Sequence, residues 1–93
     1  MTHWRLNPTC QLHWRCWDSD YILFNVASGQ THFLNDLGAF TLELVAEQTL
    51  DKEALLEALA LRFEDFVIDD ELREYVATML EDLDNLGLIE PVP

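Results

Sequence analysis

The sequence predicts an α+β fold, in which a three-stranded antiparallel sheet is followed by three helices, the order of a winged-helix-like domain. Three observations lead to this prediction. Apolar residues alternate with a period of two in the first third of the chain, a Ser-Gly turn lies inside the stretch FNVASGQTHFLN, and apolar residues then recur at helical spacing. The 93 residues are enough for one domain with a modest hydrophobic core.

Three strands are expected in the first third of the chain. Leu12–Trp17 alternates in the way that a half-buried strand does. Tyr21–Val26 carries apolar residues on both faces, which favours the central position in the sheet. Gly29 supplies the positive φ that a tight turn requires, and Thr31–Leu34 then forms the third strand. Meander order places this third strand at the edge of the sheet, with one row of backbone groups unpaired.

Three helices are expected in the remainder of the chain. The first covers Asp36–Glu47, with Asn35 or Asp36 as its cap, and Thr49 is expected to cap the second. The third begins with a run of acidic residues and ends at Gly87 in a Schellman motif. Its apolar stripe comprises Leu72, Tyr75, Val76, Met79, Leu80, Leu83 and Leu86.

The two ends of the chain show no clear pattern. Residues 1–9 are expected to be a lead-in, because Asn7 and Pro8 form a turn signal. Residues 10–90 then form the folded domain and residues 91–93 a tail. No segment approaches the roughly 20 apolar residues that a membrane span needs. We therefore expect a cytoplasmic protein without a membrane partner.

The charge of the chain is strongly acidic. It holds 18 Asp and Glu residues against 5 Lys and Arg, which gives a net charge of -13. Such a surface repels phosphate, so nucleic acid is disfavoured as a partner, whereas a basic or neutral partner is favoured. Cys10 and Cys16 are expected to be free thiols. An extended strand would hold them nearly 20 Å apart, well beyond the roughly 7 Å between Cα atoms that a disulfide allows.

The sequence contains none of the common catalytic patterns. It has no Gly-rich phosphate loop, no nucleophile elbow and no HExxH pair. His3, His13, His32, Cys10 and Cys16 lack the paired short spacings of zinc sites. We therefore expect a protein that is not an enzyme and that has no metal or other cofactor.

Motifs along nearly the whole chain resemble a known family. They are Trp4, the WRCWD run at Trp14–Asp18, the pattern FN-x-x-SG-x-TH-x-LN from Phe24 to Asn35, and T-L-D-x-x-x-L from Thr49. Together they resemble the PqqD-like proteins. More narrowly, they are similar to the PqqD-family peptide chaperones of HPr-kinase-related systems, described as HPr-rel-A.

The resemblance implies a RiPP recognition element, a small winged-helix-like domain that binds the leader of a ribosomally made precursor peptide. Such a domain presents the leader to a modifying enzyme. The narrower resemblance implies an HPr-kinase-related system, so the expected partner is a modifying enzyme or an HPr-kinase-like protein. In that family the leader adds as a strand to the third strand and packs between it and the third helix. Carried onto this chain, the implied peptide-binding residues are Gln30, Thr31, His32, Phe33, Leu34, Tyr75 and Met79.

Each of these assignments has a simpler structural interpretation. The stripe of the third helix, with Tyr75 and Met79, also fits a hydrophobic core. His32 is more simply a satisfied or solvent-facing structural histidine. The acidic residues of the third helix fit a solvated face, and a role in docking a basic leader is the sharper hypothesis. Trp4, Trp14 and Trp17 are expected to pack against the sheet.

Two other functions are left open. One is a winged-helix regulator that binds DNA, although Arg73 is the only basic residue in the third helix. The other is a structural subunit that docks on a kinase-like ATPase and binds no peptide. The open strand edge could also pair with a second copy of the chain, so the oligomeric state stays open.

Overall fold

The computed structural model describes residues 2–18, 20–63 and 67–92. Within these ranges the chain forms six strands and three helices, and the predicted α+β fold is confirmed. The elements are β1 (His3–Leu6), β2 (Leu12–Trp17), β3 (Asp20–Asn25), β4 (Gln30–Leu34), α1 (Asp36–Glu47), β5 (Leu50–Asp51), α2 (Lys52–Arg62), α3 (Asp70–Asn85) and β6 (Ile89–Val92).

The predicted meander forms an antiparallel sheet in the order β2-β3-β4. Its strands begin and end within one residue of the predicted bounds. As expected, β3 is central and β4 lies at an edge. The turn between β3 and β4 contains Gly29 at a φ of 75°, and the Gly29 N–H donates to the carbonyl oxygen of Asn25 at 2.8 Å.

A second antiparallel sheet, in the order β5-β1-β6, was not predicted. Residues 1–9, expected to be a lead-in, contain β1, which pairs with β6 over its whole length and with β5 at its start. Residues 91–93 were expected to be a tail, but β6 continues to Val92. These strands are short, and their partners are distant in sequence, so no local turn signal announces them. Pro91 is tolerated because β6 is an edge strand.

Each helix begins at an amide or carboxylate cap. Asn35 caps α1 and accepts a hydrogen bond from the Gly38 N–H at 2.8 Å, which confirms one of the two predicted caps. Asp69 caps α3 by accepting from the Leu72 N–H at 2.9 Å. The prediction that Thr49 caps α2 is wrong. Asp51 is the cap and accepts from the Ala54 N–H at 2.8 Å, because pairing with β1 keeps the chain extended as far as Asp51.

The end of α3 is the predicted Schellman motif. Gly87 has a φ of 79°, and its N–H donates to Asp84 O at 2.9 Å. The Leu88 N–H donates to Leu83 O at 3.1 Å, and the side chains of Leu83 and Leu88 are both buried. This ending turns the chain directly into β6.

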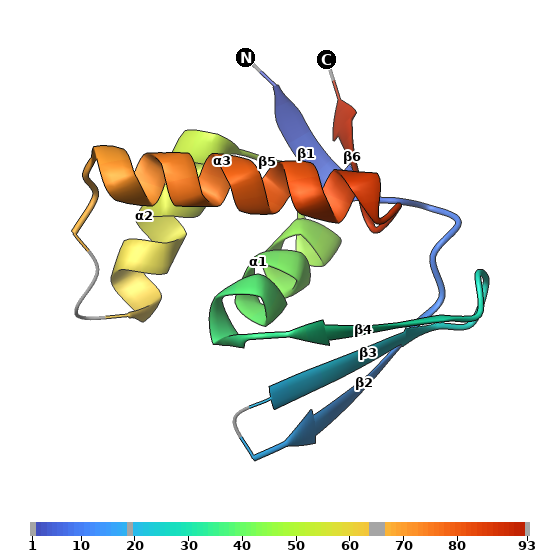
Figure 1. Ribbon diagram of the computed structural model, residues 1–93. Helices are drawn as coiled ribbons and strands as arrows, with labels where there is room; N and C mark the ends of the chain where they lie inside the picture. The colour runs from blue at the N-terminus through green and yellow to red at the C-terminus, as the bar shows by residue number, and fades with distance from the viewer. Residues whose placement is uncertain (1, 19, 64–66, 93) are drawn as a thin grey trace.

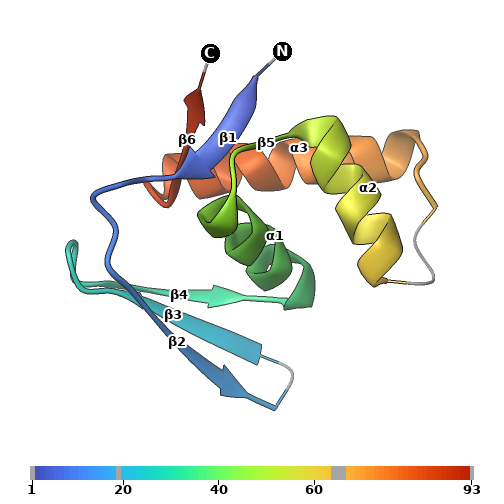
Figure 2. The same cartoon turned by 180° about the vertical axis from the view of Figure 1, so that it is seen from behind.

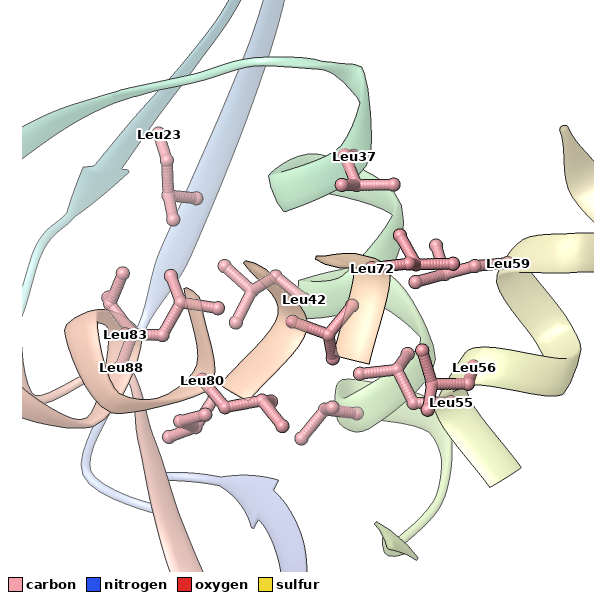
Figure 3. Close-up of a cluster of buried hydrophobic side chains, with 13 residues drawn as sticks. Leu23, Leu37, Leu42, Leu55, Leu56, Leu59, Leu72, Leu80, Leu83 and Leu88 are labelled. Atoms are coloured by element: carbon pink, nitrogen blue, oxygen red, sulfur yellow. The ribbon is translucent and has the colours of Figure 1, made fainter. Parts of the chain in front are cut away.

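Leucines dominate the core, which all three helices and both sheets share (Figure 3). The structure confirms that much of the α3 stripe is core, since Leu72, Val76, Leu80 and Leu83 are buried. Trp4 and Trp14 are partly buried against this cluster, as predicted, whereas the side chain of Trp17 lies outside the described part of the structure.

Helix α1 separates the sheet β2-β3-β4 from α3 (Figures 1 and 2). Strands β1 and β6 lie side by side and bring the two ends of the chain together on the opposite side of the molecule from that sheet. None of the three helices has the length and apolar character needed to cross a bilayer, for the residues described. The arrangement leaves the edge strand β4 facing α3 across the start of α1.

The Asp51→Ala variant tests the corrected cap. Loss of the cap is expected to lower the free energy of unfolding by about 1 kcal/mol, whereas Asp51→Asn should lose less because it keeps a side-chain acceptor. Thr49→Ala, at an exposed position, should change it by less than about 0.5 kcal/mol. Urea unfolding followed by circular dichroism measures all three variants. Equal losses at positions 49 and 51 would contradict the assignment.

Candidate functional site

The backbone of β4 carries alternate groups to its open edge, and one hydrogen bond shows which residues these are. The Val26 N–H donates to Gln11 O at 2.8 Å, beside the register pair Leu12 and Asn25. In an antiparallel ladder, a bond between the flanking residues marks the enclosed pair as non-hydrogen-bonded. The backbone groups of Asn25 therefore point away from β2, toward β4.

The alternation continues along β4. Asn25 pairs with Gln30, Leu23 with His32 and Tyr21 with Leu34. Because these pairs are two residues apart, the backbone groups of Gln30, His32 and Leu34 all face β3. Beside the turn, the Gln30 N–H donates to the Ser28 Oγ at 3.3 Å. The N–H and C=O groups of Thr31 and Phe33 point to the open edge.

The side chains of β4 alternate between the two faces of the sheet. His32 and Leu34 share the face of the fully buried Leu23, and Leu34 packs against the core. Thr31 and Phe33 point to the other face of the sheet, where Phe33 is 75% exposed. The predicted edge residues therefore divide into an inward set and an outward set.

A groove of about 280 Å³ separates the end of β4 from α3. It contains the predicted residues Phe33, Leu34, Tyr75 and Met79. The remaining lining residues were not predicted as part of a site. Those on α3 follow Tyr75 at spacings of three and four, which place them on the same helix face as Tyr75. The complete lining is Phe33, Leu34, Asn35, Gly38, Tyr75, Thr78, Met79, Asp82, Leu83 and Leu86.

A second hollow, which we call the acid-rimmed hollow, adjoins this groove and was not foreseen. It has a volume of about 870 Å³ and shares Asn35 and Tyr75 with the groove. The Asn35 Nδ2 donates to the Tyr75 Oη at 3.4 Å, and this hydrogen bond lies at the boundary between the groove and the acid-rimmed hollow. Its lining is Asn35, Asp36, Leu37, Phe63, Val67, Asp69, Glu71, Leu72 and Tyr75.

Met79 and His32 occupy positions between core and surface. Met79 is partly buried against the core, and the Thr41 hydroxyl lies 3.9 Å from its sulfur, yet it also lines the groove. The expectation that His32 is satisfied or solvent-facing does not hold for its Nε2 atom. Its Nε2 atom is buried and has no hydrogen-bond partner among the residues described, because the ring points inward from the edge strand.

Asn25 is a buried polar residue that joins three segments. Its Oδ1 accepts from the backbone N–H groups of Gln11 and Ala27, each at 3.1 Å, and its Nδ2 lies 3.5 Å from the Cys10 sulfur. Burial raises the pKa of the Cys10 thiol, which donates to Gly87 O at 3.3 Å. Both cysteines are free thiols, and Cys10 acts as a structural contact.

The electrostatic character of the site is acidic. Asp82 lines the groove, and three further carboxylates line the acid-rimmed hollow. Arg73, the single basic residue of α3, is paired with Glu53 on α2. Across the described ranges, no three His, Cys, Asp or Glu side chains are grouped in a way that could hold a metal ion. The arrangement offers backbone hydrogen bonding beside an apolar, acid-edged surface.

Amide hydrogen exchange tests the assignment of the open edge. The amides of Thr31 and Phe33 should exchange rapidly, because they have no partner in the ladder, whereas those of His32 and Leu34 should be protected. Residue-resolved NMR exchange measures all four in one sample. Protection of the Thr31 and Phe33 amides, with rapid exchange at His32 and Leu34, would show that Thr31 and Phe33 bond to β3 and that the open edge belongs to the other residues.

Comparison with known proteins identifies the family of this chain. The family described as "Coenzyme PQQ synthesis protein D (PqqD)" matches residues 20–89. A solved structure, "TbiB1 in Complex with the TbiA(beta) Leader Peptide", has the same fold, with a TM-score of 0.69 and 17% sequence identity. The alignment covers 92% of this chain and 94% of that one. A search of curated proteins gave no match. Since the family match extends from β3 to the start of β6, this chain belongs to the PqqD family.

Proposed function

We propose that this protein binds the leader segment of a ribosomally synthesised precursor peptide by strand addition to β4, and presents it to a modifying enzyme. The observation that carries the proposal is the open backbone edge of Thr31 and Phe33 beside a groove walled by α3. Family membership and the fold shared with TbiB1, which was solved with a leader peptide, support it.

The geometry divides affinity and selectivity between backbone and side chains. A peptide strand paired with β4 would gain hydrogen bonds from the edge groups of Thr31 and Phe33, which do not depend on peptide sequence. Alternate peptide side chains would then point toward the groove, where Leu34, Tyr75 and Met79 offer apolar contact. An unbranched methionine suits a surface that accepts more than one apolar side chain.

The other edge of the same sheet, β2, is a weaker candidate. The hollow that β2 lines is on the outer face of the sheet, with His13 and Arg15 among its residues. By contrast, β4 borders the groove whose opposite wall is α3. Strand addition at β4 therefore brings peptide side chains into contact with two elements instead of one.

In this proposal the protein has no catalytic step of its own and acts by delivering its peptide. The modifying enzyme is an HPr-kinase-like protein of an HPr-rel-A system, a partner supported by the motif resemblance described above. The encounter takes place in the cytoplasm, where ribosomes release the precursor. A DNA-binding role is disfavoured, because α3 carries acids at its start and along its length and its single arginine is paired with Glu53.

Titration with a leader peptide tests the proposal. The probe is the leader of a precursor encoded beside this gene, added to isotope-labelled protein while backbone amide shifts are followed by NMR. The largest shifts are expected at Thr31, Phe33 and the groove face of α3. The absence of binding at high micromolar peptide, or shifts confined to other elements, would contradict strand addition at β4.

Thr31→Pro tests the backbone component. Proline removes the N–H that points to the open edge but takes no hydrogen bond from β3, so the fold should persist. Leader affinity should fall about 10-fold or more. The matched control, Thr31→Ala, keeps the N–H and should bind within about 3-fold of the parent protein. Equal affinities of the two variants would exclude a backbone contact at this position.

Tyr75→Ala tests the groove wall. The ring is 48% exposed, so its loss should affect leader affinity, by about 10-fold, more than it affects stability. Tyr75→Phe keeps the apolar ring and should bind nearly as well as the parent. Leu61→Ala is the control for a general surface effect, because Leu61 is 87% exposed on α2 and lines neither hollow. Calorimetric titration measures all three variants.

A further inference from the structure

We infer that the acid-rimmed hollow binds an arginine or lysine side chain of the same peptide, at the end of the paired segment that lies beside Leu34. This inference rests on the proposed function and adds a chemical requirement to it. The peptide must carry a basic residue at one end of its apolar, strand-paired stretch.

The position of the hollow follows from the chain itself. Asn35, Asp36 and Leu37 come directly after β4 and line the hollow, while Leu34 and Asn35 line the groove. A peptide strand paired with β4 that extends past Leu34 would therefore leave the groove and enter the hollow. The Asn35 to Tyr75 contact marks the passage from one to the other.

The surface of the hollow fits a long basic side chain better than a purely apolar one. Its floor includes the buried Leu37 and Leu72 and the half-exposed ring of Tyr75. Lysine and arginine lay an aliphatic stem along such a surface while the charged head reaches a polar rim. A guanidinium also gains from contact with an aromatic face. In this protein the guanidinium of Arg62 already lies 5.5 Å from the ring centroid of Phe63.

Two carboxylates of the rim are available to a ligand. Asp69 is committed to capping α3 through the Leu72 N–H. Asp36 and Glu71 have no ion-pair partner among the residues described, since the ion pairs found there involve Asp51, Glu90 and Glu53. A cation in the hollow would therefore meet two carboxylates that form no ion pair within the described part of the chain.

The helix ends only partly offset this charge. Asp36 and Glu71 lie in the first turns of α1 and α3, whose N-termini each contribute about half a positive charge. Arg62 adds one cation over Phe63. Against these stand the three lining carboxylates and Asp70, which precedes Glu71 in the same turn. The balance favours a cation, in agreement with the net charge of -13.

Selection from a random-sequence peptide display library tests the inference without knowledge of the natural precursor. Peptides selected on the parent protein should share an apolar stretch with arginine or lysine enriched at one end. Selection on the double variant Asp36→Asn, Glu71→Gln should keep the apolar stretch and lose the basic enrichment. The control double variant Glu57→Gln, Glu81→Gln has the same change in charge but alters exposed carboxylates outside the groove and the acid-rimmed hollow. Peptides selected on this control should keep the basic enrichment.

The outcomes separate the inference from the proposed function. Selected peptides that shift the Thr31 and Phe33 amides but show no basic enrichment, or the same enrichment on the double variant, would overturn the basic-residue site alone. If no selected peptide perturbs β4, both the site and the proposed function fail. In the supporting case, replacing the enriched basic residue of one peptide by glutamine should weaken binding to the parent by about 3- to 10-fold and leave binding to the double variant unchanged.

Discussion

The site depends on the register of the β2-β3-β4 sheet, and a buried asparagine at the end of β3 helps to fix the register between β2 and β3. Asn25 is 6% exposed. Its side-chain oxygen accepts hydrogen bonds from the backbone N–H of Gln11, just before β2, and of Ala27, in the turn after β3. A slip of one residue between β2 and β3 would take the Gln11 N–H away from the Asn25 side chain and weaken the hydrogen bonding of a buried amide, which is costly. If the other set of β3 backbone groups faced β4, the edge-facing groups of β4 would move from Thr31 and Phe33 to their neighbours, and the side chains of β4 would turn to the opposite faces of the sheet.

The groove exists because helix α1 keeps its two walls apart. The chain passes from β4 into α1 without a loop, through the single cap residue Asn35. Helix α1 then packs between the sheet and α3, so α3 faces the end of β4 without closing onto it (Figure 1). Met79 illustrates the result, since it both contacts Thr41 on α1 and lines the groove. Core packing and groove width are therefore set by the same side chains.

Local signals predicted the elements whose partners are close in sequence. The alternation in β2 and β3, the turn at Gly29 and the Schellman ending at Gly87 each act within a few residues, and all are present. The second sheet joins strands from the start, middle and end of the chain, and four residues of β1 carry no comparable signal. The cap of α2 was misplaced for the same reason, because the pairing of β5 with β1 decides where α2 begins.

The candidate site was only partly predictable on the same grounds. Family motifs and meander order indicated the edge strand and the wall on α3. The acid-rimmed hollow combines the start of α1, the end of α2 and the start of α3, so it needed the tertiary arrangement. The inward direction of His32 follows from its register with Leu23, which sequence spacing alone does not give.

An open strand edge is also a hazard, because any other extended chain can pair with it, including another copy of the same protein. Here β4 carries no lysine or proline to discourage such pairing. The charge of the whole molecule takes over that role. Two copies that each carry a net charge of -13 repel one another over about a Debye length, while a basic peptide is drawn toward the same surface. Long-range charge thus disfavours pairing of this edge with another copy of the chain, and favours a basic extended segment there, before any backbone contact forms.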